Sequence, residues 1–112
     1  MNQDIKQRWV DALRFGEYKQ GKGCLHDSSD NSFCCLGVLT DLYIKEHDKD
    51  WRKPEDHTRL EFEGQRDVLP PSVTTWAGLD RSCSLLSGCD LATRNDNGMS
   101  FYELAQLIED AL

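Results

Sequence analysis

The sequence predicts an α+β fold that is mainly helical, with three or four helices and a small antiparallel sheet in a single domain. Three observations carry this prediction. Apolar residues recur at helical spacing in two long segments, one near each end of the chain. Short alternating segments bordered by turn-forming residues, over residues 23–34 and 58–69, are typical of strands. The length of 112 residues is that of one domain of ordinary size.

The first helix is expected over residues 5–15. Ile5, Trp9 and Leu13 fall on one face of that helix, because they are spaced by four residues. Gly16 then favours termination, since glycine readily adopts the left-handed conformation that follows a last helical turn.

The polar segment 17–32 is expected to be a loop that contains one hairpin. In this hairpin, residues 23–26 pair with residues 32–34 across the turn-forming sequence 27–31. The pairing would bring the first loop next to the start of the second helix.

The second helix is expected to run from about residue 32 to residue 47. Gly37 is unfavourable inside a helix by about 1 kcal/mol relative to alanine. Either another backbone segment approaches closely at Gly37, or the helix begins only after it. The expected apolar face consists of Cys35, Leu36, Leu39, Leu42 and Tyr43.

Residues 58–62 alternate like a half-buried strand. Pro70 and Pro71 end the sheet segment and favour a short helix, since proline is well placed in a first turn. Gly78 is expected to end this helix. The segment 82–96 is the least regular, with one helical turn expected over residues 91–94.

The last helix has the clearest start signal. Ser100 and Glu103 form the S-x-x-E capping box, with Met99 and Leu104 placed as a hydrophobic staple. The expected core of the whole domain consists of Ile5, Trp9, Leu13, Phe33, Leu36, Leu39, Leu42, Phe62, Leu69, Val73, Trp76, Leu104 and Ile108.

The net charge of −7 argues against direct binding to nucleic acid, whose phosphates would repel the chain. The charge is uneven: residues 1–24 hold five Lys/Arg and three Asp/Glu, a net of +2, so the remainder carries −9. No window is apolar enough for a membrane span, and the polar first residues lack a secretory signal. We therefore expect a cytoplasmic protein that does not bind a membrane.

Four ordered phrases resemble a widespread group of small proteins from tailed phages and prophages. They are Trp9–Gln20 (WVDALRFGEYKQ), Phe33–Tyr43 (FCCLGVLTDLY), Leu69–Leu79 (LPPSVTTWAGL) and Asn95–Glu109 (NDNGMSFYELAQLIE). The resemblance covers nearly the whole chain. It implies a phage-encoded accessory protein that acts in the cytoplasm of a bacterial host, and it implies no particular activity.

The cysteines are expected to be reduced, buried and inert. In the enzymatic alternative, Cys34 or Cys35 is a nucleophile at a helix start, where the helix dipole lowers a thiol pKa. Its base would be His26, with His47 and His57 as the other candidates. A zinc site would need two closely spaced ligand pairs, and Cys24-x-His26 and Cys83-x5-Cys89 fit that pattern poorly. We predict no metal and no cofactor.

A set of polar residues is not needed by the expected helices and is predicted to bind a ligand. Arginine, lysine, tyrosine and Asn/Asp side chains are suited to the phosphate, base and ribose of a nucleotide-like anion. The set consists of Arg14, Tyr18, Gln20, Lys22, Asn95 and Asp96.

The sequence thus favours a binding protein over an enzyme. The first expectation is a counter-defence protein that sequesters a host immune signal, such as a cyclic nucleotide or a cyclic ADP-ribose derivative. The alternative is an acidic inhibitor that occupies a basic surface on a host defence nuclease. The sequence leaves self-association into a homo-oligomer open.

Overall fold

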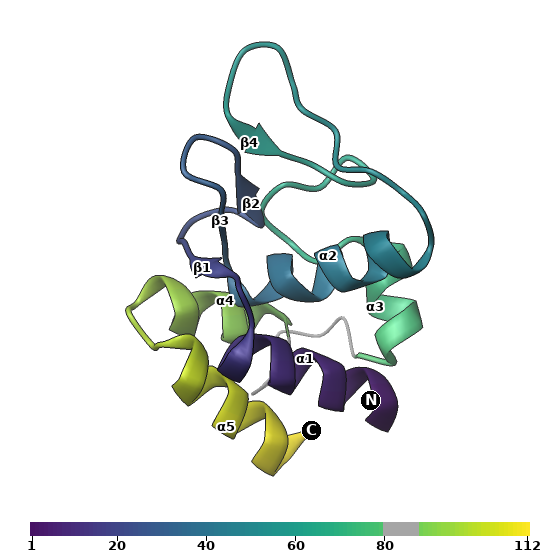
Figure 1. Cartoon of the computed structure of the whole chain (residues 1–112), viewed down its shortest axis with the longest axis vertical. Helices are drawn as coiled ribbons and strands as arrows, with labels where there is room; N and C mark the ends of the chain where they lie inside the picture. Colours follow the sequence, from purple (N-terminus) through teal and green to yellow (C-terminus); the bar gives the residue numbers. More distant parts are fainter. Residues whose placement is uncertain (80–87) are drawn as a thin grey trace.

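Helices make up most of the secondary structure of the computed structural model, which describes residues 1–79 and 88–112 (Figure 1). The expected mainly helical α+β class is confirmed. The turn expected over residues 91–94 is a complete helix, so that the described residues form five helices. The elements are α1 (Gln3–Phe15), β1 (Lys19–Gln20), β2 (His26–Asp27), β3 (Ser32–Phe33), α2 (Cys35–Glu46), β4 (Arg59–Leu60), α3 (Pro71–Ala77), α4 (Gly88–Asp96) and α5 (Phe101–Ala111).

Helices α1 and α5 come from opposite ends of the sequence and pack along each other in antiparallel directions (Figure 1). At one end, the side-chain amide of Gln3 donates to the carbonyl oxygen of Leu112 at 3.4 Å. At the other end, Arg14 donates to the side chain of Gln106 at 2.9 Å. Helix α2 lies across α1 on the side opposite α5 (Figure 1).

The helices begin and end at residues suited to those positions. The Asn2 side chain accepts a hydrogen bond from the backbone N–H of Ile5 at 3.0 Å and caps α1. The predicted capping box of α5 is confirmed: the Ser100 hydroxyl accepts from the N–H of Glu103, and the Glu103 carboxylate accepts from the N–H of Ser100. Gly78 ends α3 with a φ of 71°.

The sheet has the order β1-β3-β2-β4 and is mixed. The predicted hairpin is confirmed, with His26 opposite Phe33 in an antiparallel pair of β2 and β3. β4 also pairs antiparallel with β2. The antiparallel sheet expected from residues 23–34 and 58–69 is thus confirmed, and β1, which the sequence did not predict, extends it by running parallel to β3. The reason is that the loop after β1 reverses the chain before the hairpin reverses it again.

Gly37 lies in the first turn of α2, where the backbone of Leu25 passes alongside. A Cβ atom at position 37 would lie 1.7 Å from the carbonyl oxygen of Leu25. Of the two explanations left open by the sequence, the close approach of another backbone is therefore the right one, since α2 already begins at Cys35.

The core lies between α1, α2, α4 and α5, where Trp9, Leu36 and Leu104 are completely buried. Nine of the thirteen expected core residues are buried. The other four are only partly buried: Leu42, Phe62, Leu69 and Trp76. Within the part of the chain that the structure describes, every helix is too short or too polar to cross a bilayer.

Candidate functional site

The structure brings three of the six predicted ligand-binding residues together. The side-chain amide of Gln20 donates to the Asn95 side-chain oxygen at 2.9 Å and to the carbonyl oxygen of Met99 at 2.8 Å. The Gln20 side-chain oxygen accepts from the N–H of Phe101 at 3.1 Å. The Gln20 side chain thus joins the first loop to the connection between α4 and α5.

Asn95 and Asp96 reinforce the same connection. Asn95 is completely buried, and its amide donates to the carbonyl oxygen of Gly21 at 2.8 Å. The Asp96 carboxylate accepts from the N–H of Gly23 at 3.0 Å. The polar groups of this cluster are therefore used to hold two loops together.

Arg14 lies apart from that cluster, at the packing surface of α1 and α5. Its guanidinium forms an ion pair with Glu109, donates to Gln106, and lies 5.9 Å from the ring centroid of Tyr102. Only 15 % of the Arg14 side chain is exposed. Lys22 follows Gln20 by two residues in the first loop, and its side chain is exposed.

Tyr18 belongs to a third environment, centred on the buried carboxylate of Asp41. The Tyr18 hydroxyl donates to the Asp41 carboxylate at 2.6 Å, and the Trp51 indole donates to it at 3.1 Å. Lys45 forms an ion pair with Asp41 at 2.9 Å. Burial and the hydrogen bond to Asp41 raise the pKa of Tyr18 to about 12. Burial opposes ionisation of Asp41, but the three donors outweigh it and lower the pKa of Asp41. Tyr18 is thus committed to a structural hydrogen bond.

The two cysteines and His26 of the enzymatic alternative are in buried, structural positions. Cys34 is the N-cap of α2, where its sulfur accepts from the N–H of Gly37 at 3.4 Å, and burial raises its pKa to about 12. Burial also raises the pKa of Cys35 well above its ordinary value. His26 stacks on Phe33 with ring centroids 3.8 Å apart. Both thiols are therefore protonated at neutral pH, which disfavours nucleophilic attack.

Metal ligands do not converge in the described residues. Among residues 1–79 and 88–112, no three His, Cys, Asp or Glu side chains come together as they would around a metal ion. The Cys83 and Cys89 side chains considered for zinc lie outside the part of the chain that is described at side-chain level.

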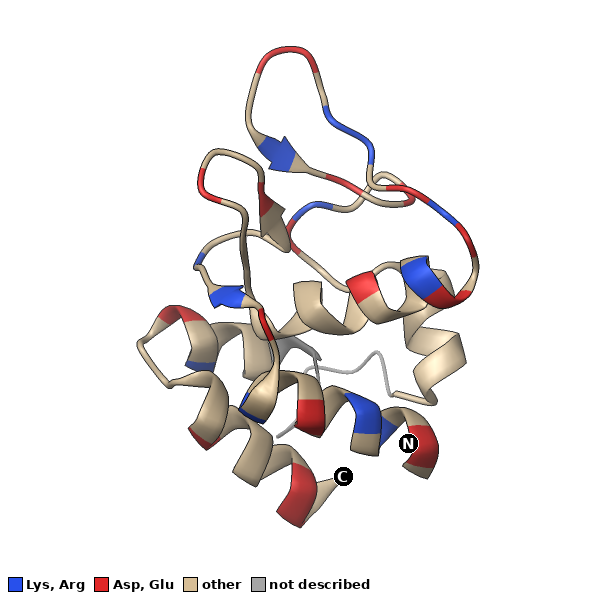
Figure 2. Ribbon diagram, viewed as in Figure 1, with Lys and Arg blue, Asp and Glu red and all other residues tan. Residues whose placement is uncertain are grey.

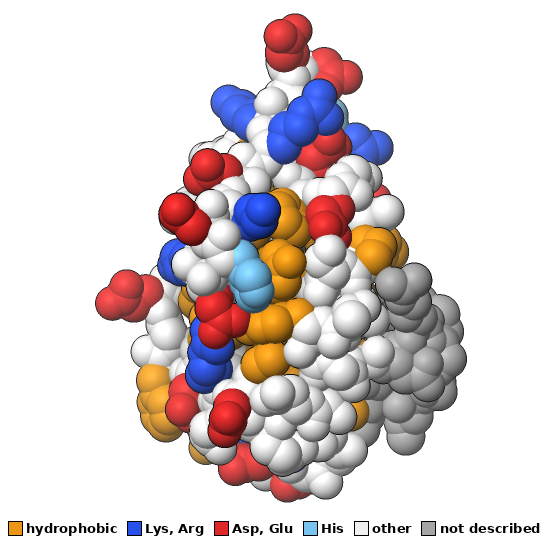
Figure 3. Space-filling view, turned by 90° about the vertical axis from the view of Figure 1, so that its right-hand side faces the viewer, with side chains coloured by type: hydrophobic (Ala, Val, Ile, Leu, Met, Phe, Trp, Pro, Cys, Tyr) orange, Lys and Arg blue, Asp and Glu red, His pale blue; other side chains and the backbone are white. Residues whose placement is uncertain are grey.

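A groove of about 420 Å³ lies between the last turn of α2 and helix α3. Figure 3 views this side of the molecule, where hydrophobic side chains form a strip flanked by charged ones. We call this feature the aromatic groove. Its lining consists of Tyr43, His47, Pro71, Ser72, Thr75 and Trp76.

The rings of the aromatic groove meet nearly at right angles. Tyr43 and His47 are stacked, with centroids 4.0 Å apart and planes 22° apart. Trp76 stands across both, at 75° to Tyr43 and 84° to His47, with centroids 5.3 and 5.9 Å away. Phe62 supports Tyr43 from a distance of 5.8 Å. The rings thus form a corner in which each ring contacts at least one other.

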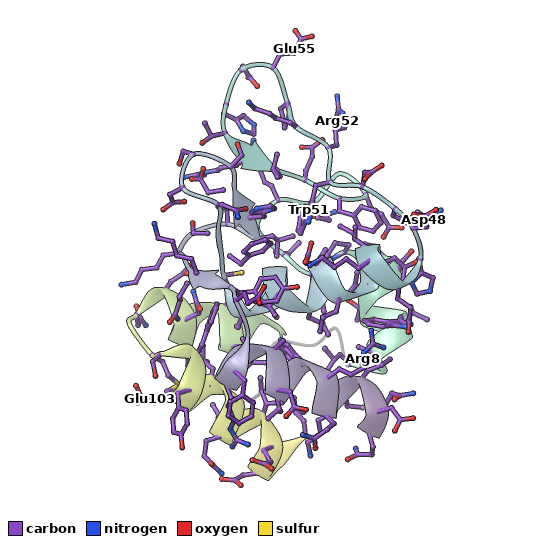
Figure 4. All side chains as sticks on the ribbon, in the orientation of Figure 1. Arg8, Asp48, Trp51, Arg52, Glu55 and Glu103 are labelled. Carbon is purple, nitrogen blue, oxygen red and sulfur yellow. The ribbon has the colours of Figure 1, made fainter. Side chains whose placement is uncertain are left out.

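Charged groups border this corner. The Trp76 indole donates to the Glu46 carboxylate at 2.8 Å, and Arg8 donates to the other Glu46 oxygen at 2.9 Å. The Arg8 guanidinium also lies 5.7 Å from the centroid of the Trp76 ring. Ser72 on α3 donates to the Glu63 carboxylate, from its N–H at 3.0 Å and from its hydroxyl at 2.5 Å. Figure 4 shows Arg8 on the same side of the molecule as the end of α2.

Sequence reasoning missed the aromatic groove as a site, although its parts were visible. Tyr43 and His47 are four residues apart, and Ser72, Thr75 and Trp76 are spaced by three and four, so each set lies on one helical face. All the lining residues except His47 fall in the two phrases 33–43 and 69–79 on which the phage resemblance depends.

Comparisons with known proteins give one match. Neither the curated proteins nor the solved structures contain a match to this chain. The match is to a family model described as a domain of unknown function, and it extends over residues 1–112. The chain therefore belongs to the domain family DUF8296.

Proposed function

We propose that this protein is a non-enzymatic binding protein that inhibits a basic partner protein by docking onto it through the aromatic groove. The observation that carries the proposal is an open corner of aromatic rings on an acidic protein. Tyrosine and tryptophan in a concave surface are the side chains that contribute most to protein–protein binding. The buried, protonated thiols argue against the enzymatic alternative.

The electrostatics favour a basic partner over a nucleotide-like anion. Glu46 and Glu63 contact lining residues of the groove, and the carboxyl end of α2 adds the negative end of its helix dipole. Arg8 balances the charge of Glu46, so Glu63 and the helix end are the groups that disfavour a phosphate there. Three of the five basic residues in the first 24 form ion pairs with acids, namely Arg8, Arg14 and Lys19. Figure 2 shows acidic residues distributed over most of the molecule.

The resemblance to phage and prophage proteins supports a role during infection. In this proposal the protein is phage-encoded, acts in the bacterial cytoplasm, and blocks a host defence nuclease. Nucleases carry basic surfaces that hold nucleic acid phosphates, and an acidic protein can occupy such a surface. Sequestration of a cyclic nucleotide or cyclic ADP-ribose has less support, because Asn95 and Gln20 are bonded to the protein itself.

The test uses a substitution that fills the aromatic groove. Thr75 is exposed on α3, so that Thr75→Arg should fold while obstructing the groove. Thr58→Arg, at an exposed threonine outside the groove, is the matched control. The wild type and both variants are expressed in bacterial strains that each carry one defence nuclease, and plaque formation by a restricted phage is counted.

We expect the wild type and Thr58→Arg to restore plaques on a responding strain, and Thr75→Arg to fail. The purified nuclease of that strain should bind the wild type in calorimetry, with an affinity that falls as salt rises. Rescue by Thr75→Arg equal to the wild type, or no rescue on any strain, would contradict the proposal. A cyclic nucleotide that raises the melting temperature and is released intact on denaturation would instead favour sequestration.

A further inference from the structure

We infer that the aromatic groove recognises a single cationic side chain of its partner, with arginine preferred over lysine. This inference rests on the proposed function and adds the chemistry of recognition. The first observation is that one face of the groove's tryptophan already binds a guanidinium from the same chain. Arg8 lies over the Trp76 ring at 5.7 Å and is held there by Glu46.

The contact between Arg8 and Trp76 combines two elements, an aromatic face and a carboxylate. The electron-rich face of an indole attracts a cation, and the carboxylate fixes the guanidinium by hydrogen bonds. Glu46 serves both partners at once, since its second oxygen accepts from the Trp76 indole. The local structure therefore favours a planar cation.

The groove offers the same combination to an incoming group. Trp76 stands at 75° to Tyr43 and 84° to His47, which are stacked on each other, so a cation in the corner would contact Trp76 and one ring of the stacked pair. Glu63 lies against Ser72 on the α3 side, and the end of α2 contributes its negative dipole. An apolar side chain would fit against the rings but would not be attracted by this negative potential.

Arginine fits this corner better than lysine. Its planar guanidinium stacks on an aromatic face and is more weakly hydrated than an ammonium group, so less free energy is lost when it leaves water. The hydroxyl groups of Ser72 and Thr75 also line the groove and can accept its outward N–H groups. We therefore expect affinity to decrease from arginine to lysine to a neutral analogue.

The probes are single capped amino acids, which separate charge from shape. N-acetyl-arginine amide is titrated into ¹⁵N-labelled protein, with N-acetyl-lysine amide and N-acetyl-citrulline amide in parallel at constant ionic strength. Citrulline has nearly the shape of arginine without its charge. The reported signal is the indole N–H of Trp76, assigned by its absence in Trp76→Phe.

We expect a saturable shift with arginine amide at millimolar concentration and an affinity at least tenfold lower with citrulline amide. In Thr75→Arg the new guanidinium should occupy the corner, so the Trp76 signal should be shifted without ligand and the titration response should be lost. Thr58→Arg should respond like the wild type.

Equal, unsaturable shifts with arginine and citrulline amides would overturn the inference, as would an unchanged response in Thr75→Arg. These outcomes are separable from failure of the proposed function. If a nuclease binds the wild type but not Thr75→Arg while arginine amide does not bind, only the cationic recognition is wrong. If arginine amide binds but no nuclease is inhibited, only the proposed function is wrong.

Discussion

Replacing Gly37 by alanine tests whether the close contact between α2 and the first loop requires glycine at position 37. The new Cβ would lie 1.7 Å from the oxygen and 2.6 Å from the carbon of the Leu25 carbonyl group. Leu25 is held on both sides: its N–H donates to Arg66 at 2.7 Å, and its carbonyl accepts from Cys34 at 3.2 Å. Its side chain is completely buried. The Leu25 backbone must therefore move, and its bonds must be strained.

The expected free-energy change follows from opposing contributions. Alanine in place of glycine favours the helix by about 1 kcal/mol. Overpacking against a fixed backbone costs about 1–3 kcal/mol, and weakening the bond from Cys34 to Leu25 costs about 1 kcal/mol more. The net result is a destabilisation of about 1–3 kcal/mol. For a domain of this size, each kcal/mol lowers the melting temperature by about 4–8 °C.

The measurement is urea and thermal unfolding followed by circular dichroism. Thr75→Ala is the control, because Thr75 is an exposed helical position where alanine adds propensity without a clash. We expect this control to be as stable as the wild type or slightly more stable. If Gly37→Ala were also stabilised, helix propensity alone would decide the outcome and the steric argument would be refuted.

Three further perturbations probe other contacts. Asn95→Ala should lower the free energy of unfolding by about 1–3 kcal/mol, because Gln20 and Gly21 lose their hydrogen-bond partner in a buried site. Urea titrations measure this, and no change would show that water replaces the Asn95 amide. Ser100→Ala should cost about 0.5–2 kcal/mol through loss of the cap, and an unchanged melting temperature would contradict this. Because burial raises the pKa of Cys34 to about 12, the unfolded state ionises first and stability should fall from about pH 9 towards pH 12. Cys34→Ser keeps a capping oxygen but does not ionise, so its stability should fall less steeply over that range.

The elements predicted best are those whose signals are local. Helices α1 and α5 combine apolar periodicity with residues suited to their ends. The first was expected over residues 5–15 and is observed over Gln3–Phe15, and the last was expected to start at the Ser100 cap, as observed. Strand β1 was missed, because two polar residues have no measurable period and pair only through tertiary context. Helix α4 was underestimated for a related reason: among its described side chains, the two completely buried ones are Leu91 and the polar Asn95, so apolar periodicity does not mark its inner face.

The candidate site was harder to predict than the fold. The six polar residues were chosen for their chemistry, but the sequence does not show whether a polar group already has a partner within the protein. Asn95 illustrates this, since its side chain is completely buried and bonded to the first loop. Trp76 illustrates the opposite error. Its helical spacing assigned it to the core, whereas it is partly exposed in the aromatic groove. Periodicity identifies a face of a helix and does not reveal whether another element covers that face.

The packing of α1 against α5 has a consequence for synthesis on the ribosome. The two helices form the most extensive pairing of elements in the described structure, although nearly the whole chain separates them. While translation proceeds, the face of α1 that packs on α5 would stay uncovered until α5 has been synthesised. The nascent chain therefore passes through an interval in which this uncovered face can aggregate or bind chaperones. The contact between α1 and α5 forms late, because it joins distant parts of the sequence.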